Sequence, residues 1–150
     1  MLNRRTFLVA LGASTLLVSS CGVIQNSDSV APVYGELEKI IRAKQELISD
    51  AKWLLVAEPA LSGPLQVVVD QNLIHVDALA SYLPAGASPS PSSVVSESVD
   101  LTALAARCKV FSANSLQVAS NSPDAEISRV VALIAGSEIQ HHAMLIGYII

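Results

Sequence analysis

Apolar residues recur every three or four positions in the segment that begins at Val33, and most of its charged residues fall between them. Side chains with this spacing share one face of an α-helix. The pattern therefore predicts an amphipathic helix that ends near Glu58-Pro59. Its apolar stripe consists of Leu37, Ile40, Ile41, Leu47, Ile48, Ala51, Leu54 and Leu55.

Three further helices are predicted downstream. The second runs from Pro64 to Leu83, with proline in the first turn, where the backbone has no intrahelical acceptor to lose. The third spans Ser98 to Ala119. The fourth starts at Ser122-Pro123-Asp124, which combines a cap, a proline at the first helical position and an acid that favours the helix dipole. Residues 84 to 96, rich in proline and serine, form a linker.

The lengths of the connections constrain how these helices are arranged. The breaks near Pro59 and Asn121 are so short that each joins antiparallel neighbours. The linker, if extended, reaches about 40 Å, which exceeds the ~30 Å length of a 20-residue helix. We therefore predict an all-α four-helix bundle of two antiparallel hairpins joined by a long crossover. An up-down-up-down bundle with a looped-out linker is the alternative.

An internal repeat supports a pair of related hairpins. Residues 72 to 83 align without gaps on residues 138 to 149. A chance match between two apolar helices is the alternative, because only three positions are identical. These positions are His75 with His141, Leu79 with Leu145, and Tyr82 with Tyr148.

The first 21 residues have the features of an export and lipidation signal. Arg4 and Arg5 precede an apolar run at 7 to 18, which is too short to span a bilayer. Val18-Ser-Ser-Cys21 resembles the bacterial lipobox, in which the cysteine thiol is joined to diacylglycerol; an ordinary cleaved signal peptide is the alternative. Asn3-Arg-Arg-Thr-Phe-Leu8 resembles the twin-arginine motif, with valine where lysine usually follows, so we favour twin-arginine over Sec export.

The segmentation that follows is a signal peptide at 1 to 21, a flexible tether at 22 to 32 and one domain at 33 to 150. With 51% hydrophobic and 15% charged residues, the chain has enough apolar side chains for one core. Cleavage before Cys21 removes two arginines and no acid, so the formal charge changes from −4 to −6. We expect no nucleic-acid partner, because no basic face is apparent. The lipid on Cys21 then provides the attachment to the outer face of the cytoplasmic membrane.

After lipidation of Cys21, Cys108 is the only remaining thiol, so no internal disulfide is expected. Cys108 falls within an apolar helical pattern and is interpreted as a small buried core residue, with a reactive thiol or metal ligand as the alternative. Trp53 and Tyr82 are expected to pack in the core or at a bundle end. His142 points about 100° away from His141 around the helix, so we expect it on the surface.

Glu138-Ile-Gln-His141 places a carboxylate and an imidazole one turn apart on one helix face. With the helix order and the crossover, this motif resembles the ferritin-like superfamily, and more narrowly a ferritin-like domain of exported bacterial lipoproteins, over residues 33 to 150. The resemblance implies a di-iron site with Glu-x-x-His on the second and fourth helices and a glutamate on the first and third.

That di-iron site is degenerate in this sequence. The second helix offers Asn72 and His75, with an amide in place of the carboxylate. The third has no acid between Asp100 and Asp124, and its inward polar candidates are Ser112 and Asn114. The first helix contributes Glu38 or Glu46. A pair of iron ions requires more anionic oxygens than this.

Two interpretations of the polar residues stay open. In the first, His75 and His141 face each other across the bundle as partly buried side chains bonded to Asn72 and Glu138, no cofactor is bound, and Glu138→Gln is tolerated. In the second, a single transition metal binds His75, Glu138, His141 and Glu46.

The expected function is therefore a non-catalytic binding or structural module of the cell envelope. A partner protein, a second copy forming a homodimer, or a small ligand would bind it. A metal-binding or oxidoreductase domain is the alternative. No nucleophile elbow, phosphate loop, dinucleotide fingerprint or paired-cysteine zinc motif is found, which favours a protein that is not an enzyme.

Overall fold

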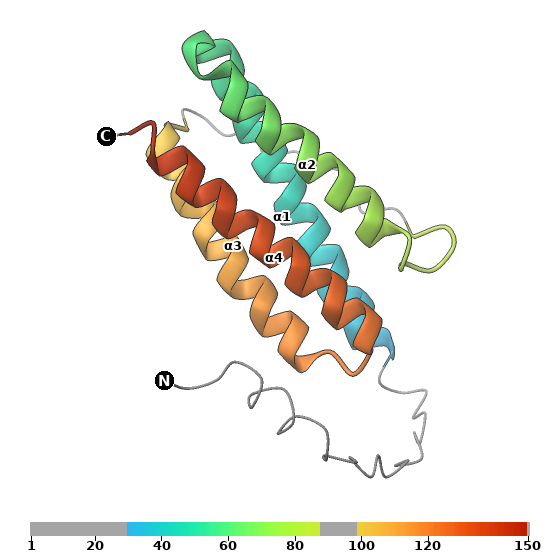
Figure 1. Ribbon diagram of the computed structural model, residues 1–150. Coiled ribbons are helices and arrows are strands. Elements are labelled where there is room, and N and C mark those ends of the chain that lie inside the picture. The colour runs from blue at the N-terminus through green and yellow to red at the C-terminus, as the bar shows by residue number, and fades with distance from the viewer. Residues whose placement is uncertain (1–29, 88–98, 150) are drawn as a thin grey trace, which may run out of the picture.

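The computed structural model describes residues 30 to 87 and 99 to 149. The described residues form α1 (Val30–Ala57), a 3-10 turn η2 (Pro59–Leu61), α2 (Ser62–Ala80), α3 (Leu101–Asn121) and α4 (Ala125–Ile146) (Figure 1). They include no β-strand, so the predicted all-helical class is confirmed, and the arrangement is compatible with a four-helix bundle. None of the described helices combines the length and the hydrophobicity that crossing a bilayer requires. The signal residues Arg4, Arg5 and Cys21 lie outside the described residues.

The first two helices begin earlier than predicted. Helix α1 starts at Val30 and so includes the end of the segment predicted as a tether. Helix α2 starts at Ser62, and Pro64 lies in its first turn, where a missing amide proton breaks no helical bond. It ends at Ala80 rather than Leu83. Beyond Ala80 the backbone forms turns with bonds between residues three apart, such as the 3.1 Å bond from Leu83 N to Ala80 O.

Aspartate side chains cap the N-termini of the last two helices. An Asp100 carboxylate oxygen accepts a 2.7 Å bond from Ala103 N at the start of α3. One Asp124 oxygen accepts bonds of 2.9 Å from the amides of Glu126 and Ile127, so it caps α4. Pro123 precedes the helix, which therefore starts two residues later than predicted: its cap is Asp124 and not Ser122. A carboxylate at this position also interacts favourably with the helix dipole.

The helices pack as two antiparallel pairs, α1 with α2 and α3 with α4. Contacts between the pairs join the late part of one helix to the early part of another: Asp50 of α1 pairs with Arg107 of α3, and the hydroxyl of Tyr82, just after α2, with Glu126 of α4. Helices α1 and α3 are therefore antiparallel to each other, and so are α2 and α4. Helices α2 and α3 consequently run in the same direction, and the end of α2 and the start of α3 lie at opposite ends of the bundle (Figure 1).

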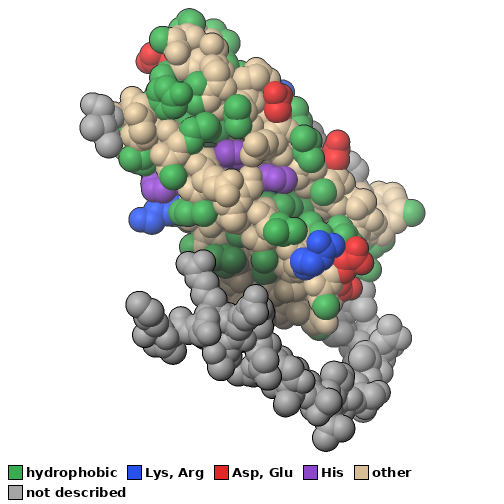
Figure 2. Space-filling view, viewed as in Figure 1, with side chains coloured by type: hydrophobic (Ala, Val, Ile, Leu, Met, Phe, Trp, Pro, Cys, Tyr) green, Lys and Arg blue, Asp and Glu red, His purple; other side chains and the backbone are tan. Residues whose placement is uncertain are grey.

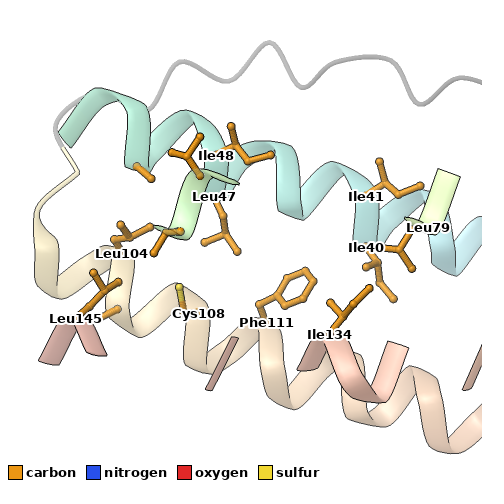
Figure 3. Close-up of a cluster of buried hydrophobic side chains, with 14 of the residues drawn as sticks. Ile40, Ile41, Leu47, Ile48, Leu79, Leu104, Cys108, Phe111, Ile134 and Leu145 are labelled. Carbon is orange, nitrogen blue, oxygen red and sulfur yellow. The ribbon is translucent and has the colours of Figure 1, made fainter. Parts of the chain in front are cut away.

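The core lies between the four helices. Seven of the eight residues of the predicted α1 stripe are buried, and Leu55 packs beside them. Leu104, Cys108 and Phe111 project from α3 toward this stripe (Figure 3). Each fully buried aliphatic or aromatic side chain contributes about 1.5–3 kcal/mol to stability. The prediction of a buried Cys108 is confirmed.

Three predictions about single side chains are wrong. Trp53 is 42% exposed, since it lies about 100° around α1 from buried Leu54. Asn114 is also exposed, and of the two inward candidates on α3 only Ser112 is buried. His142 is half-buried, because its Nδ1 lies 2.9 Å from the Ala105 carbonyl oxygen on the adjacent helix α3.

Candidate functional site

A fully buried lysine, Lys44, lies near the middle of α1. Its ammonium donates a 2.5 Å bond to Glu138 Oε1 and a 2.7 Å bond to Asn72 Oδ1, and it lies 3.2 Å from His75 Nδ1. An ammonium has three protons, so these acceptors can use all of them. The ring of Phe111, 4.4 Å from Nζ to its centroid, adds a cation–π contact. All four helices therefore contribute to this cluster.

Two charged residues on the apolar stripe of α1 were missed by the sequence analysis. Lys44 follows Ile41 by three residues and precedes Leu47 by three, so helical spacing places it among the core residues. Asp50 has the same relation to Leu47. The signal was present in the sequence as a charge at a position where the periodicity requires an apolar residue.

Asp50 forms a second ion pair, between α1 and α3. Its carboxylate is buried and accepts a short bond from the Arg107 guanidinium, whose side chain is 47% exposed. The other carboxylate oxygen, Oδ1, is buried without a hydrogen-bond partner among the described residues. A buried carboxylate that is paired with only one oxygen depends strongly on that partner.

The predicted polar residues converge around Glu138. Its Oε1 lies 3.9 Å from His75 Nδ1, and its Oε2 lies 3.3 Å from His141 Nδ1. Neither of these two buried atoms has a hydrogen-bond partner among the described residues, so at this distance they interact electrostatically. On its other side, His141 Nε2 lies 2.8 Å from Gln71 Oε1, which also accepts a 3.1 Å bond from Ser137. The prediction that Glu138 contacts an imidazole is confirmed, whereas Gln71 was missed.

Residues that align in the internal repeat take up similar positions in the structure. Asn72 and Glu138, which align in the repeat, both present an oxygen to Lys44. Leu79 and Leu145, the next aligned pair, are both fully buried. The correspondence ends at the tyrosines: Tyr82 is half-buried against Glu126, whereas 55% of Tyr148 is exposed.

The electrostatics of the cluster favour a charged Lys44–Glu138 pair beside a neutral His75. Burial acts to raise the pKa of Glu138, but His141 and Lys44 outweigh it and lower the pKa to about 2. Burial lowers the pKa of Lys44, and the adjacent carboxylate partly offsets this effect. Burial and the positive Lys44 together lower the pKa of His75 to about 4. At pH 7 the unprotonated Nδ1 of His75 can therefore accept a hydrogen bond from the ammonium.

The cluster approaches solvent through the seam between α2 and α4. The His75 side chain is 17% exposed, and Gln71 on the same side of α2 is exposed. Figure 2 shows histidine side chains near the middle of this face, among hydrophobic and uncharged groups. Among the side chains around Lys44, His75 is thus the one most exposed to solvent.

The four predicted metal ligands do not come together as one set. His75 and Glu138 contact the Lys44 ammonium, and His141 lies beside Glu138. Glu46 instead lines a groove between α1 and α3 with Arg107 and neighbouring residues. No group of three His, Cys, Asp or Glu side chains within the described ranges is arranged to hold a metal ion. The ammonium uses the oxygens of Asn72 and Glu138 that a cation would need, so these residues fit Lys44 better than a metal.

Cys108 adds no further ligand to this cluster. Its side chain is fully buried, and burial, with the negative charge of Glu138 nearby, raises the pKa of the thiol. The thiol therefore stays protonated, and a protonated thiol is a poor metal ligand and a poor nucleophile.

Comparisons with protein families, with curated proteins and with solved structures gave no match for this chain. The fold and the cluster define its class: an all-helical domain with four α-helices among the described residues, centred on a buried lysine and carboxylate.

Replacing Lys44 with methionine should destabilise the fold by about 3–5 kcal/mol, because it leaves Glu138 buried without its cation. Glu138→Gln should destabilise the fold because it leaves the Lys44 cation buried without its anion. The buried lysine therefore leads us to replace the expectation that this substitution is tolerated. The double variant Lys44→Met/Glu138→Leu should lose less than the sum of the single variants. Urea unfolding measures all three. The control is Lys52→Met at an exposed position of the same helix, and an equal effect of Lys44→Met and Lys52→Met would contradict the assignment.

The fold should lose stability as the pH falls from 6.5 toward 4. His75 has an ordinary pKa of 6.5 and a folded-state pKa of about 4, so the unfolded chain binds a proton that the folded chain excludes. Each pH unit in this window then costs up to about 1.4 kcal/mol. Glu138 adds a loss in the same direction between pH 4.5 and about 2. Unfolding measured between pH 7 and 5 should show a slope that His75→Gln removes, and an unchanged slope would disprove the role of His75.

Proposed function

We propose that this chain is a membrane-anchored bacterial lipoprotein whose ferritin-like bundle acts as a binding or structural module of the cell envelope. The observation that carries the proposal is the buried Lys44 ammonium, held by Asn72, His75 and Glu138. In this interpretation Lys44 replaces a metal ion as the cation of the bundle. The domain then binds a partner protein, a second copy or a small ligand, and is not an enzyme.

The charges of the cluster support this replacement. Glu138 supplies one negative charge, which balances the single positive charge of Lys44, and Asn72 supplies a neutral oxygen. A di-iron centre needs several carboxylates to balance its charge. The antiparallel pairs and the parallel α2 and α3 agree with the helix order of a ferritin-like bundle.

The N-terminal sequence supports the location. Arg4 and Arg5, the apolar run at 7 to 18 and Val18-Ser-Ser-Cys21 form a signal in which Cys21 receives the lipid. The twin-arginine route exports folded proteins, which suits a helical bundle that forms before transport. The lipid on Cys21 then holds the domain at the extracytoplasmic face of the membrane.

The convergence of His75, Glu138 and His141 favours a second candidate, a metal-binding or oxidoreductase domain. In that case the Lys44 amine would have to leave the oxygen of Glu138 before a metal could bind there. Glu46, the fourth predicted ligand, would also have to move from the groove that it lines between α1 and α3. Both requirements make this candidate weaker than the first.

Replacing Cys21 with serine should release the protein from membranes or leave it unprocessed, because serine cannot form the thioether to diacylglycerol. Cell fractionation with metabolic labelling by a radioactive fatty acid measures both effects. The control is Cys108→Ser, which leaves the lipobox intact. A Cys21→Ser protein that still fractionates as mature, lipid-labelled protein would show that the lipoprotein assignment is wrong.

Protein purified without chelator should contain no stoichiometric zinc, copper or iron, because the Lys44 ammonium occupies the acceptors. Elemental analysis of the wild type and of Glu138→Gln, His141→Ala and the control His142→Ala tests this. Near-stoichiometric metal in the wild type and in His142→Ala, lost in the other two variants, would establish the metal-binding candidate instead.

A further inference from the structure

Two rows of uncharged side chains lie on either side of the seam between α2 and α4. The row on α2 consists of Val67, Gln71, Ile74 and Ala78, and the row on α4 consists of Leu133, Ser137, Gln140 and Met144. Within each row the spacings are four, three and four residues, so its members share one face of their helix. Gln71 and Ser137 are joined by a 3.1 Å hydrogen bond across the seam, so the two rows form one surface of the bundle, the α2–α4 face.

The α2–α4 face leaves large apolar side chains in solvent. Ile74 is 66% exposed, Leu133 63% and Val67 40%. Figure 2 shows hydrophobic and uncharged groups around the histidines in the middle of this face, with charged groups nearer its edges. Apolar side chains that gather on one uncharged face mark a contact with another molecule, whereas single exposed ones need no explanation.

The two rows match each other in height along the bundle. Asn72 and Glu138 bond the same ammonium, which places them at one height, and Gln71 accordingly contacts both Ser137 and His141. Because α2 and α4 are antiparallel, equal steps forward along α2 and backward along α4 keep the height equal. Each member of one row then lies within one residue, or about 1.5 Å, of a member of the other. The pairs are Val67 with Met144, Gln71 with Gln140, Ile74 with Ser137, and Ala78 with Leu133.

We propose that the α2–α4 face binds the same face of a second copy, around a twofold axis that runs parallel to the helices. Such an axis lays α2 of each copy on α4 of the other without changing any height, so each of the four pairs meets twice across the interface. Ala78 is small where Leu133 of the second copy is large, and the carboxamides of Gln71 and Gln140 can donate to and accept from each other. At both ends of the rows apolar side chains face apolar ones.

A second copy fits this face better than a different partner does. The face matches itself in size and polarity at four heights, and self-matching is what an isologous dimer requires. Neither row carries a charge, whereas the whole chain has a net charge of −4, so two copies repel each other less here than elsewhere. This inference rests on the proposed function, in which a second copy is one of the partners of the module.

The size of the face sets the strength of the dimer. Helix α2 has 19 residues and is therefore ~28 Å long, and two neighbouring helices are about 20 Å wide. The face thus covers on the order of 600 Å², less than the ~800 Å² that each partner buries in a standard interface. We therefore expect a dissociation constant in the micromolar range, which the local concentration of two copies attached to one membrane would exceed.

Sedimentation equilibrium of the full chain carrying Cys21→Ser tests the dimer without an attached lipid. Ile74→Glu and Leu133→Glu should each raise the dissociation constant at least about a hundredfold, because each places two uncompensated charges in the interface. The matched controls are Val110→Glu and Leu116→Glu, at hydrophobic positions of α3 that are 60% and 52% exposed, and they should leave the constant unchanged. Circular dichroism checks that all variants keep their helices. A parent chain that stays monomeric at millimolar concentration, or association that survives Ile74→Glu, would overturn the proposal.

Mixtures of two variants test which residues meet. Ala78→Lys and Leu133→Glu should each weaken self-association, but a mixture of the two chains should recover a heterodimer. In that heterodimer the introduced lysine lies against the introduced glutamate, and the second copy of the contact stays native. The matched control mixes Val67→Lys with Leu133→Glu and should not recover association, because Val67 lies opposite Met144 at the other end of the row. Recovery in both mixtures, or in neither, would overturn the arrangement.

Failure of the dimer and failure of the proposed function give different results. The sedimentation experiment uses a chain that carries no lipid, so its outcome does not depend on processing. Monomeric behaviour together with normal lipid labelling of the wild type would refute the dimer alone. A dimer together with no lipid labelling of the wild type would refute the anchor alone.

Discussion

The ion pair between Lys44 and Glu138 is the interaction on which the bundle depends. Both side chains are fully buried, and transferring either charge from water without the other would cost several kcal/mol. The pair therefore forms only when α1 and α4 meet in one register. Asn72 and His75 of α2 and Phe111 of α3 complete the surroundings of the ammonium, so correct placement of Lys44 requires all four helices.

Helix α1 carries a second buried charge of opposite sign. Lys44 is satisfied by α2 and α4, whereas Asp50, about two turns further along, is satisfied by Arg107 of α3. Apolar packing alone tolerates small rotations and shifts of a helix, because it has little directionality. We infer that the two ion pairs fix the rotation and the height of α1 against the other helices, which is a use attested for buried polar groups elsewhere.

The sequence predicted the features of this fold that depend on local spacing. The apolar stripe of α1, the helix start near Asp124 and the meeting of Glu138 with His75 and His141 all follow from helical periodicity and connection length. Lys44 could not be predicted as a core residue from hydrophobicity, because a charged side chain is usually exposed even where its position lies on the apolar stripe. Trp53 immediately precedes buried Leu54, so its angle around the helix places it outside the core despite its hydrophobicity. Which oxygens surround the ammonium depends on contacts between helices, and periodicity within one helix does not determine them.

Phe111 belongs to two environments at once. Its ring contacts the Lys44 ammonium, and its side chain also lines an open groove between the N-terminal half of α1 and the C-terminal half of α3. A smaller residue at this position would enlarge the groove and also weaken the contact that helps to keep a cation in the core. The shape of the outer surface and the charge state of the interior are therefore not free to evolve separately. A lineage that altered one of them through this residue would have to compensate in the other.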